Sequence, residues 1–339
     1  MIDVNTIQAQ KAIGNWKPNI YLSNLCCSYF EEATYAHKRL FPLCPVQFPS
    51  GHFYEFSLAD LARDNVQRKP DYGTVNPAVM GHSENSYSCK VDQIIIGLDQ
   101  IITLAYQRAV TPGMADPRRA RVRTMTEQLA LHQEMDFAKK FFKTGVWANE
   151  WTGASTADTA NKKFKRFNNS DVDPVEFFDR LIIDVRRAGR RKPNKLALGM
   201  ETFKALKNHP FILERIKYSG TQQNPAIVNE NVLAQVFGVD QVIVLDATYN
   251  AAGIGEPIDM RYVCDSKGAL LMFAPDTPQI DMPSAGYTFT WMLNGSNYIA
   301  VDQFEKNDGS HTDFLEAIIA YDMRKTSDAL AVYLTACVD

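Results

Sequence analysis

The residues that could carry catalysis or bind a metal ion are scattered along this chain. Ser23, Ser28 and Ser219 do not lie in the strand-to-helix turn that exposes a nucleophilic serine. Gly253 and Gly255 lack the third, helix-opening glycine of a dinucleotide-binding loop, and no phosphate-binding loop ending in Gly-Lys-Ser or Gly-Lys-Thr occurs. The histidines follow no metal-ligand spacing; they are His37, His52, His82, His132, His209 and His311. The sequence therefore predicts no catalytic residue, metal ion or cofactor, although a site assembled only in the fold keeps a metal-free α/β enzyme open as an alternative.

The cysteines do not form a disulfide framework. There are six of them, Cys26 and Cys27 are adjacent, and the other four are far apart. This pattern favours free thiols in a reducing cytoplasm. The first residues lack the basic and apolar regions of a signal peptide, and no window approaches the roughly 20 apolar residues that span a bilayer. We expect a soluble protein made inside the cell, with no membrane contact.

Composition narrows the class further. The chain has 339 residues, of which 45% are hydrophobic and 22% are charged, as in packed globular proteins. This length suggests two domains, or one domain with large excursions. The formal net charge of −3 argues against a dedicated sequence-specific DNA-binding protein, which usually carries a basic domain.

The first 50 or so residues predict an arm rather than a domain. Their aromatic side chains follow no sustained period, and Pro18, Pro42, Pro45 and Pro49 interrupt any helix. Such a segment has to lie on another surface, either that of its own body or that of a neighbour.

A projecting hairpin follows the arm. Residues 51–56 and 87–96 are strand candidates, and the stretch between them is polar and interrupted by proline and glycine. A connection this long without structure of its own is usually functional or disordered. Because an isolated two-stranded hairpin is marginal in water, we expect it to lie against another subunit.

The clearest helix is predicted over residues 116–144, with Asp116 as N-cap, Pro117 at the first position and Gly145 after its end. At about 1.5 Å per residue it is a rod of roughly 40 Å. Its first turns are basic, although they face the positive end of the helix dipole. An anionic partner is expected to offset these charges, which belong to Arg118, Arg119, Arg121 and Arg123.

A basic loop leads to a second helix and then to alternating strands and helices. The loop contains Lys162, Lys163, Lys165 and Arg166. The helix is predicted over 173–188, capped by Asp173 and stopped by Gly189. From Pro193 onward, strands are predicted at 195–199, 241–245, 268–273 and 287–291, helices at 201–208 and 229–237, and two β-rich runs close the chain.

The order of these parts resembles a tailed-phage major capsid protein of the Hong Kong ninety-seven fold. The resemblance covers nearly the whole chain and is most specific over residues 196–210, with 234–239 and 247–252. It implies an α+β fold with five parts: an N-terminal arm (1–48), an E-loop (49–97), a P-domain with its spine helix (98–192), most of an A-domain (193–290) and the last P-domain strands (291–339).

The resemblance also implies a function. Members of this family self-assemble into hexamers and pentamers that close an icosahedral head shell around double-stranded DNA. The implied partners are further copies of the chain, a portal protein, a separate scaffolding protein and packaged DNA bound without regard to sequence; a decoration protein stays open. The implied location is the virion, after assembly in the host cytoplasm. An encapsulin-like cellular compartment of the same fold is the second hypothesis, and a cargo-enzyme gene beside it would favour it.

Two groups of residues are the candidates for contacts in such a shell. The basic residues of the spine helix and of the 162–166 loop would face DNA or form salt bridges with neighbours. In some relatives an E-loop lysine forms a cross-link to a neighbour; Lys69 lies in that region, although an ordinary solvated lysine is the favoured interpretation. The candidate E-loop contacts are Phe53, Tyr54, Phe56, Arg68, Lys69 and Tyr72.

Overall fold

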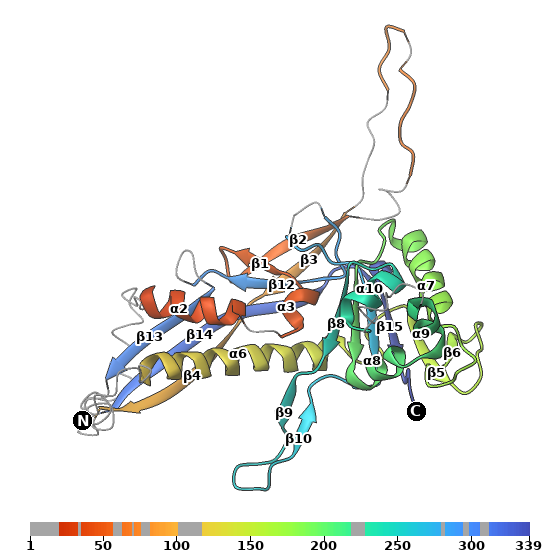
Figure 1. Cartoon of the computed structure of the whole chain (residues 1–339). Coiled ribbons are helices and arrows are strands. Elements are labelled where there is room, and N and C mark those ends of the chain that lie inside the picture. The colour runs from red at the N-terminus through yellow and green to blue at the C-terminus, as the bar shows by residue number, and fades with distance from the viewer. Residues whose placement is uncertain are drawn as a thin grey trace.

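The computed structural model describes residues 20–32, 35–56, 63–69, 71–75, 82–100, 117–217, 228–278, 282–293, 298–305 and 312–339. Figure 1 shows an elongated α+β molecule, in which helix α6 (Pro117–Phe141) runs beside one sheet toward a second sheet with its own helices. The mixed α+β class predicted from the sequence is confirmed.

The first sheet is built on the long strand β14 (Thr312–Lys325). One edge of β14 pairs along ten positions with β4 (Lys90–Asp99). The other edge pairs with β13 (Ile299–Glu305) and then with β12 (Gly286–Trp291), and β1 (Leu43–Val46) lies parallel to β12. Alternate residues of β14, such as Leu315 and Ile319, join a core with helices α2 (Ile20–Glu32) and α6. One face of this sheet is therefore covered by helices.

The second sheet has six strands in the order β6-β5-β15-β11-β7-β8. They are β6 (Lys163–Lys165), β5 (Glu150–Ala154), β15 (Ala331–Thr335), β11 (Ala269–Met272), β7 (Lys195–Gly199) and β8 (Gln241–Leu245). Strands β7 and β11 are buried throughout, because side chains of α7 (Pro174–Gly189) and α10 (Glu230–Phe237) pack on one face and the core beside α6 covers the other. The helices α8 (Met200–Lys207) and α9 (Pro210–Lys217) and the short turn η1 (Asp328–Leu330) complete this part.

The described part of the N-terminal arm lies on its own body. Helix α2 and the short α3 (His37–Leu40) fall between Pro18 and Pro42, so no proline interrupts them. Phe41 is fully buried, and its ring meets that of Phe137 edge to face with centroids 5.2 Å apart. The sequence left open whether this arm lies on its own body or on a neighbouring molecule. The described residues of the range 20–46 lie on the body of the same chain. Residues 1–19, which the sequence also assigns to the arm, lie outside the described part of the chain.

The helix termini differ from the sequence prediction in detail. Asp116 lies outside the described residues, and α6 ends at Phe141 rather than at residue 144. The turn that follows is held by the Glu150 carboxylate, which accepts hydrogen bonds of 3.0 Å from the backbone N–H groups of Gly145, Val146 and Trp147. A side chain from β5 therefore fixes the end of the helix.

Helix α7 confirms its predicted cap but not its predicted stop. The Asp173 carboxylate accepts a hydrogen bond of 2.9 Å from the N–H of Val175. The prediction that Gly189 stops the helix is wrong, because Gly189 is helical and Arg190 takes the left-handed conformation with φ 56°. A Cβ at Gly189 would lie 2.4 Å from Leu330, so the glycine permits close packing rather than a turn.

The strand predicted over 87–96 is in fact two strands. Strand β2 (Ser50–Phe56) pairs with β3 (His82–Ser88) in a two-stranded hairpin, whereas β4 starts after Cys89 and joins the first sheet. The chain changes sheets here because the Ser88 N–H donates to the Asp322 carboxylate and the Cys89 N–H to the Pro49 carbonyl. The last strand, β15, pairs in the six-stranded sheet between β5 and β11.

Candidate assembly surfaces

The segment between β2 and β3 projects from the body. Figure 1 shows the described residues 63–69 and 71–75 far from both sheets. Val66 is 89% exposed and Tyr72 is 109% exposed, with Tyr72 in a left-handed conformation at φ 62°. Apolar side chains that are this exposed on a projecting segment are available for contact with a second molecule.

Of the six residues predicted as E-loop contacts, the structure describes the side chains of four. Arg68, Lys69 and Tyr72 lie exposed on the projecting segment. Phe53 packs inside the molecule, with its ring centroid 5.1 Å from that of Phe289. The backbone of Tyr54 and Phe56 belongs to β2 at the base of the hairpin.

A second projection is the hairpin of β9 (Thr248–Asn250) and β10 (Met260–Tyr262), which leaves the body on the other side (Figure 1). Ile254 is fully exposed, and Ile258 and Met260 are 79% and 59% exposed. Strands of three residues cannot stabilise such a hairpin in water by themselves. The hairpin is a second surface suited to contacts with another subunit. The sequence indicated a glycine-rich loop here, and residues 247–252 contributed to the resemblance, but neither predicted the two strands of the hairpin.

The predicted basic residues fall into two groups at opposite ends of the molecule (Figure 1). In the α6 group, Arg118 lies 3.5 Å from the Asp313 carboxylate, Arg123 lies 3.6 Å from Glu127, and Arg119 and Arg121 are exposed. An anionic partner of Arg118 is thus found within the chain itself.

The second basic group lies on and beside edge strand β6. Lys165 pairs with Asp171 at 3.3 Å, and Arg166 pairs with Asp339. The Lys162 ammonium donates to the Ala148 carbonyl, and Lys163 is exposed. The structure does not bring the two basic groups together.

A buried polar cluster joins α3 to α6. His37 Nδ1 lies 2.8 Å from Glu134 Oε2, which also accepts a hydrogen bond of 2.8 Å from the His37 backbone N–H. His37 Nε2 lies 3.0 Å from Gln133 Oε1, and all three side chains are fully buried. The cluster holds the arm on the long helix. It is closed to solvent, so it has a structural role rather than that of a reactive site.

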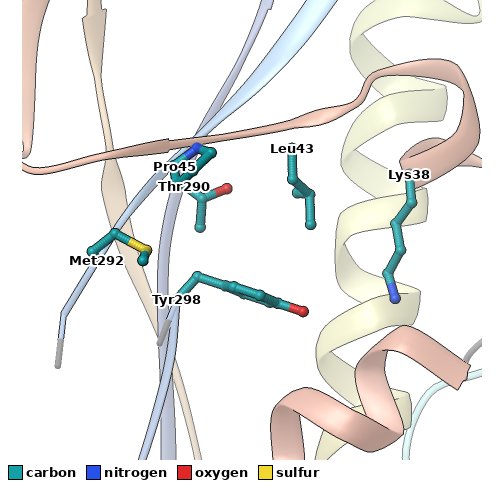
Figure 2. A pocket seen from close by; sticks show the side chains of 6 residues that line it. All are labelled: Lys38, Leu43, Pro45, Thr290, Met292 and Tyr298. Atoms are coloured by element: carbon teal, nitrogen blue, oxygen red, sulfur yellow. The ribbon is translucent and has the colours of Figure 1, made fainter. Parts of the chain in front are cut away.

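The residues that the structure describes offer little catalytic chemistry. Beside β1 and β12 lies a pocket of about 290 Å³ (Figure 2). It is lined by Lys38, Leu43, Pro45, Thr290, Met292 and Tyr298. Within the described lining there is no histidine, cysteine or carboxylate that would act as nucleophile or base. No set of three or more metal-ligating side chains converges in the parts of the chain that the structure describes. The helices among those residues are all too short or too polar to cross a membrane.

The thiols are free and mostly unreactive. Burial raises the pKa of the Cys26 thiol to about 12 and that of the Cys89 thiol to about 11. Burial also raises the pKa of Cys264 and Cys337 well above the ordinary value, because the thiolate loses its solvation.

We therefore expect an Ellman-type reagent at about pH 8 to react slowly with the four buried cysteines, Cys26, Cys89, Cys264 and Cys337, of the folded chain. The partly exposed Cys27 and Cys44 should react before them, with Cys44 slowed because burial also raises its pKa, and all six should react once guanidinium unfolds the protein. Rapid reaction of Cys264 in the folded protein would contradict the packing described above.

Comparison with known proteins identifies this architecture. No family model matches the chain. The major capsid protein of Burkholderia phage BcepMu is 24% identical over 230 residues, which are 67% of this chain and 68% of that protein. A phage-related protein of Bordetella bronchiseptica superimposes with a TM-score of 0.71 at 18% identity, covering 94% of this chain and 97% of that one. The capsid protein of cyanophage P-SCSP1u gives a TM-score of 0.52 at 12% identity, covering 89% and 88%. The chain has the phage capsid fold.

The predicted resemblance to phage major capsid proteins is thus confirmed in sequence and in fold. The capsid fold is not confined to phages, because the encapsulin of Synechococcus elongatus also superimposes, with a TM-score of 0.50 at 13% identity. In this chain the capsid fold carries two projections, the segment between β2 and β3 and the β9–β10 hairpin.

Proposed function

We propose that this chain is the major capsid protein of a tailed phage, which assembles into hexamers and pentamers of a closed head shell around double-stranded DNA. The observation that carries the proposal is the similarity over 230 residues to a phage major capsid protein. This similarity favours a phage head over the encapsulin alternative, which is supported by likeness of fold alone.

The shape of the subunit supports ring formation. Rings need heterologous contacts, in which one patch on a subunit meets a different patch on the next. The segment at 63–75 and the β9–β10 hairpin both extend away from the body with exposed apolar side chains. We assign the first to the E-loop and the second to the part of the A-domain that approaches the capsomer axis. Several modest contacts per subunit then hold a shell together through effective concentration.

Contact with packaged DNA would need scattered basic groups rather than a reader of base sequence. Arg121 and Lys163 are exposed and fit this role, whereas Arg118, Lys165 and Arg166 pair within the chain. The portal protein and a separate scaffolding protein complete the proposed set of partners, in a virion assembled in the host cytoplasm. A shell subunit of this kind has no enzymatic role.

Particles released by a host that carries the gene test the proposal. This chain should be their most abundant head protein, and it should co-sediment with double-stranded DNA that nuclease cannot reach. Particles of this chain that enclose an enzyme and no DNA would favour the encapsulin alternative. Absence of the chain from any particle would contradict both.

A further inference from the structure

Helix α7 has one buried face and one exposed face, and it lies at the margin of the molecule (Figure 1). Phe178 and Leu181 on the buried face belong to the core of the second sheet. Ile183, at the middle of the exposed face, is 56% exposed. A single exposed isoleucine is ordinary by itself, but the charged residues around this one form a pattern.

The charges on the exposed face of α7 are separated along the helix. Glu176 and Asp179 lie before Ile183, and both are exposed. Arg186 and Arg187 lie after it, and both are also exposed. The helix dipole favours acidic residues near the N-terminus and basic residues near the C-terminus, so the pattern is stable within one helix. It also gives the face an acidic half, an apolar centre and a basic half.

Contacts within the subunit leave this face accessible. The Arg187 guanidinium lies 4.0 Å from the Asp184 carboxylate, and the Arg187 side chain is 79% exposed. Arg180 is turned toward its own body, because its guanidinium lies 5.1 Å from the centre of the Trp151 ring. Arg187 can therefore reach a partner on another molecule, whereas Arg180 is already engaged.

A second copy of α7, placed antiparallel about a two-fold axis at Ile183, would bring opposite charges together. Along the helix axis Asp179 lies about 6 Å before Ile183 and Arg186 lies about 4.5 Å after it, on the same side of the face at about 100° per residue. Glu176 and Arg187 lie on the other side, about 10.5 Å before and about 6 Å after, a difference that their long side chains span. A parallel pair would instead place like charges opposite each other.

We propose that α7 is a self-association surface, on which two copies pair antiparallel about a two-fold axis at Ile183. Asp179 then faces Arg186 of the second copy, and Glu176 faces Arg187. Each ion pair occurs twice, so the face is complementary to itself, as an isologous contact requires. The ring contacts of the proposed function are heterologous, so this inference goes beyond that function.

The pairing is weak and sensitive to salt. A contact between two single helices is smaller than the roughly 1,200 Å² at which stable interfaces begin. Its ion pairs are exposed and are screened as ionic strength rises. In sedimentation velocity we expect a dimer of the unassembled subunit at low ionic strength, which added salt disperses.

A disulfide trap at the two-fold axis tests the pairing. The axis places Ile183 of one copy against Ile183 of the other, so Ile183→Cys should give a covalent dimer under mild oxidation of the concentrated chain. Ala188→Cys, exposed on the same helix but about 140° around it, is the matched control and should give at least about tenfold less dimer. Equal dimer yields from the two variants would overturn the pairing.

Charge reversal in the Ile183→Cys chain tests the antiparallel arrangement. Asp179→Arg alone, or Arg186→Asp alone, should lower the dimer yield about tenfold, because two attractions become repulsions. The two changes combined should restore the yield, because each copy then presents the exchanged pair. Glu127→Arg changes the charge equally at an exposed site on α6 and should leave the yield unaltered. Combined variants that are folded by circular dichroism but give no rescue would contradict the arrangement.

The trap also separates this inference from the proposed function. Covalent dimers of a chain that forms no shells would support the pairing while the proposed function fails. Shells from an Ile183→Cys chain that gives no more dimer than the Ala188→Cys chain would refute the pairing alone.

Discussion

Replacing residues 57–81 by Asn-Gly should leave a folded subunit that no longer builds shells. Phe56 and His82 are direct partners in the β2–β3 ladder, so a two-residue turn can close the hairpin between them. The described residues of the removed segment lie outside both sheets and contribute nothing to either main core. The loss falls on contacts between copies, which is why we expect an all-or-none effect on assembly.

Circular dichroism and the thermal midpoint should match the intact chain, while sedimentation velocity should show only small species. A variant with Val66→Ser alone is the graded control, because it removes one exposed apolar group and keeps the segment. Normal shells from the shortened chain would refute the assembly role of the projection.

The Glu134→Leu substitution should destabilise the subunit by about 1–3 kcal/mol or more, the cost of leaving buried hydrogen-bond donors without their acceptor. The His37 backbone N–H and its Nδ1 would lose their common acceptor inside a closed core. The arm helices α2 and α3 would then separate from α6 more easily. Urea unfolding of the unassembled subunit measures the loss.

Two further variants make this prediction specific. Glu127→Leu changes an exposed carboxylate on the same helix and should shift the free energy of unfolding by less than about 1 kcal/mol. His37→Leu combined with Glu134→Leu should recover only part of the loss, because the ring no longer needs an acceptor but the backbone N–H of residue 37 still lacks one. A Glu134→Leu protein as stable as the parent would show that the cluster does not hold the arm.

Elements with local signals were predictable from the sequence. Helix α10 begins after the Asn229 cap, which accepts from the Val232 N–H at 3.0 Å, and ends at Gly238 with φ 66°. The buried strand β7 followed from an uninterrupted apolar run. Both depend on residues that are close together in the sequence, so no tertiary information was needed.

Features set by distant contacts were not predictable. The division of residues 82–99 between two sheets depends on Asp322, and the end of α6 depends on Glu150. The packing of the arm depends on Phe137 of the long helix and on the buried Glu134. No signal in the arm itself identifies these partners.

The candidate contact residues divide in the same way. Exposure of Arg68, Lys69 and Tyr72 could be expected from a polar, proline-containing stretch. The inward packing of Phe53 and the pairing of Arg166 with Asp339 required the folded chain.

Electron microscopy of the purified chain, concentrated in the absence of any other phage protein, tests the central claim most directly. A subunit built to be covered by its neighbours should appear as rings of five or six copies and as closed shells. A population that stays monomeric at every concentration reached, with residues 63–75 resistant to protease, would contradict the account.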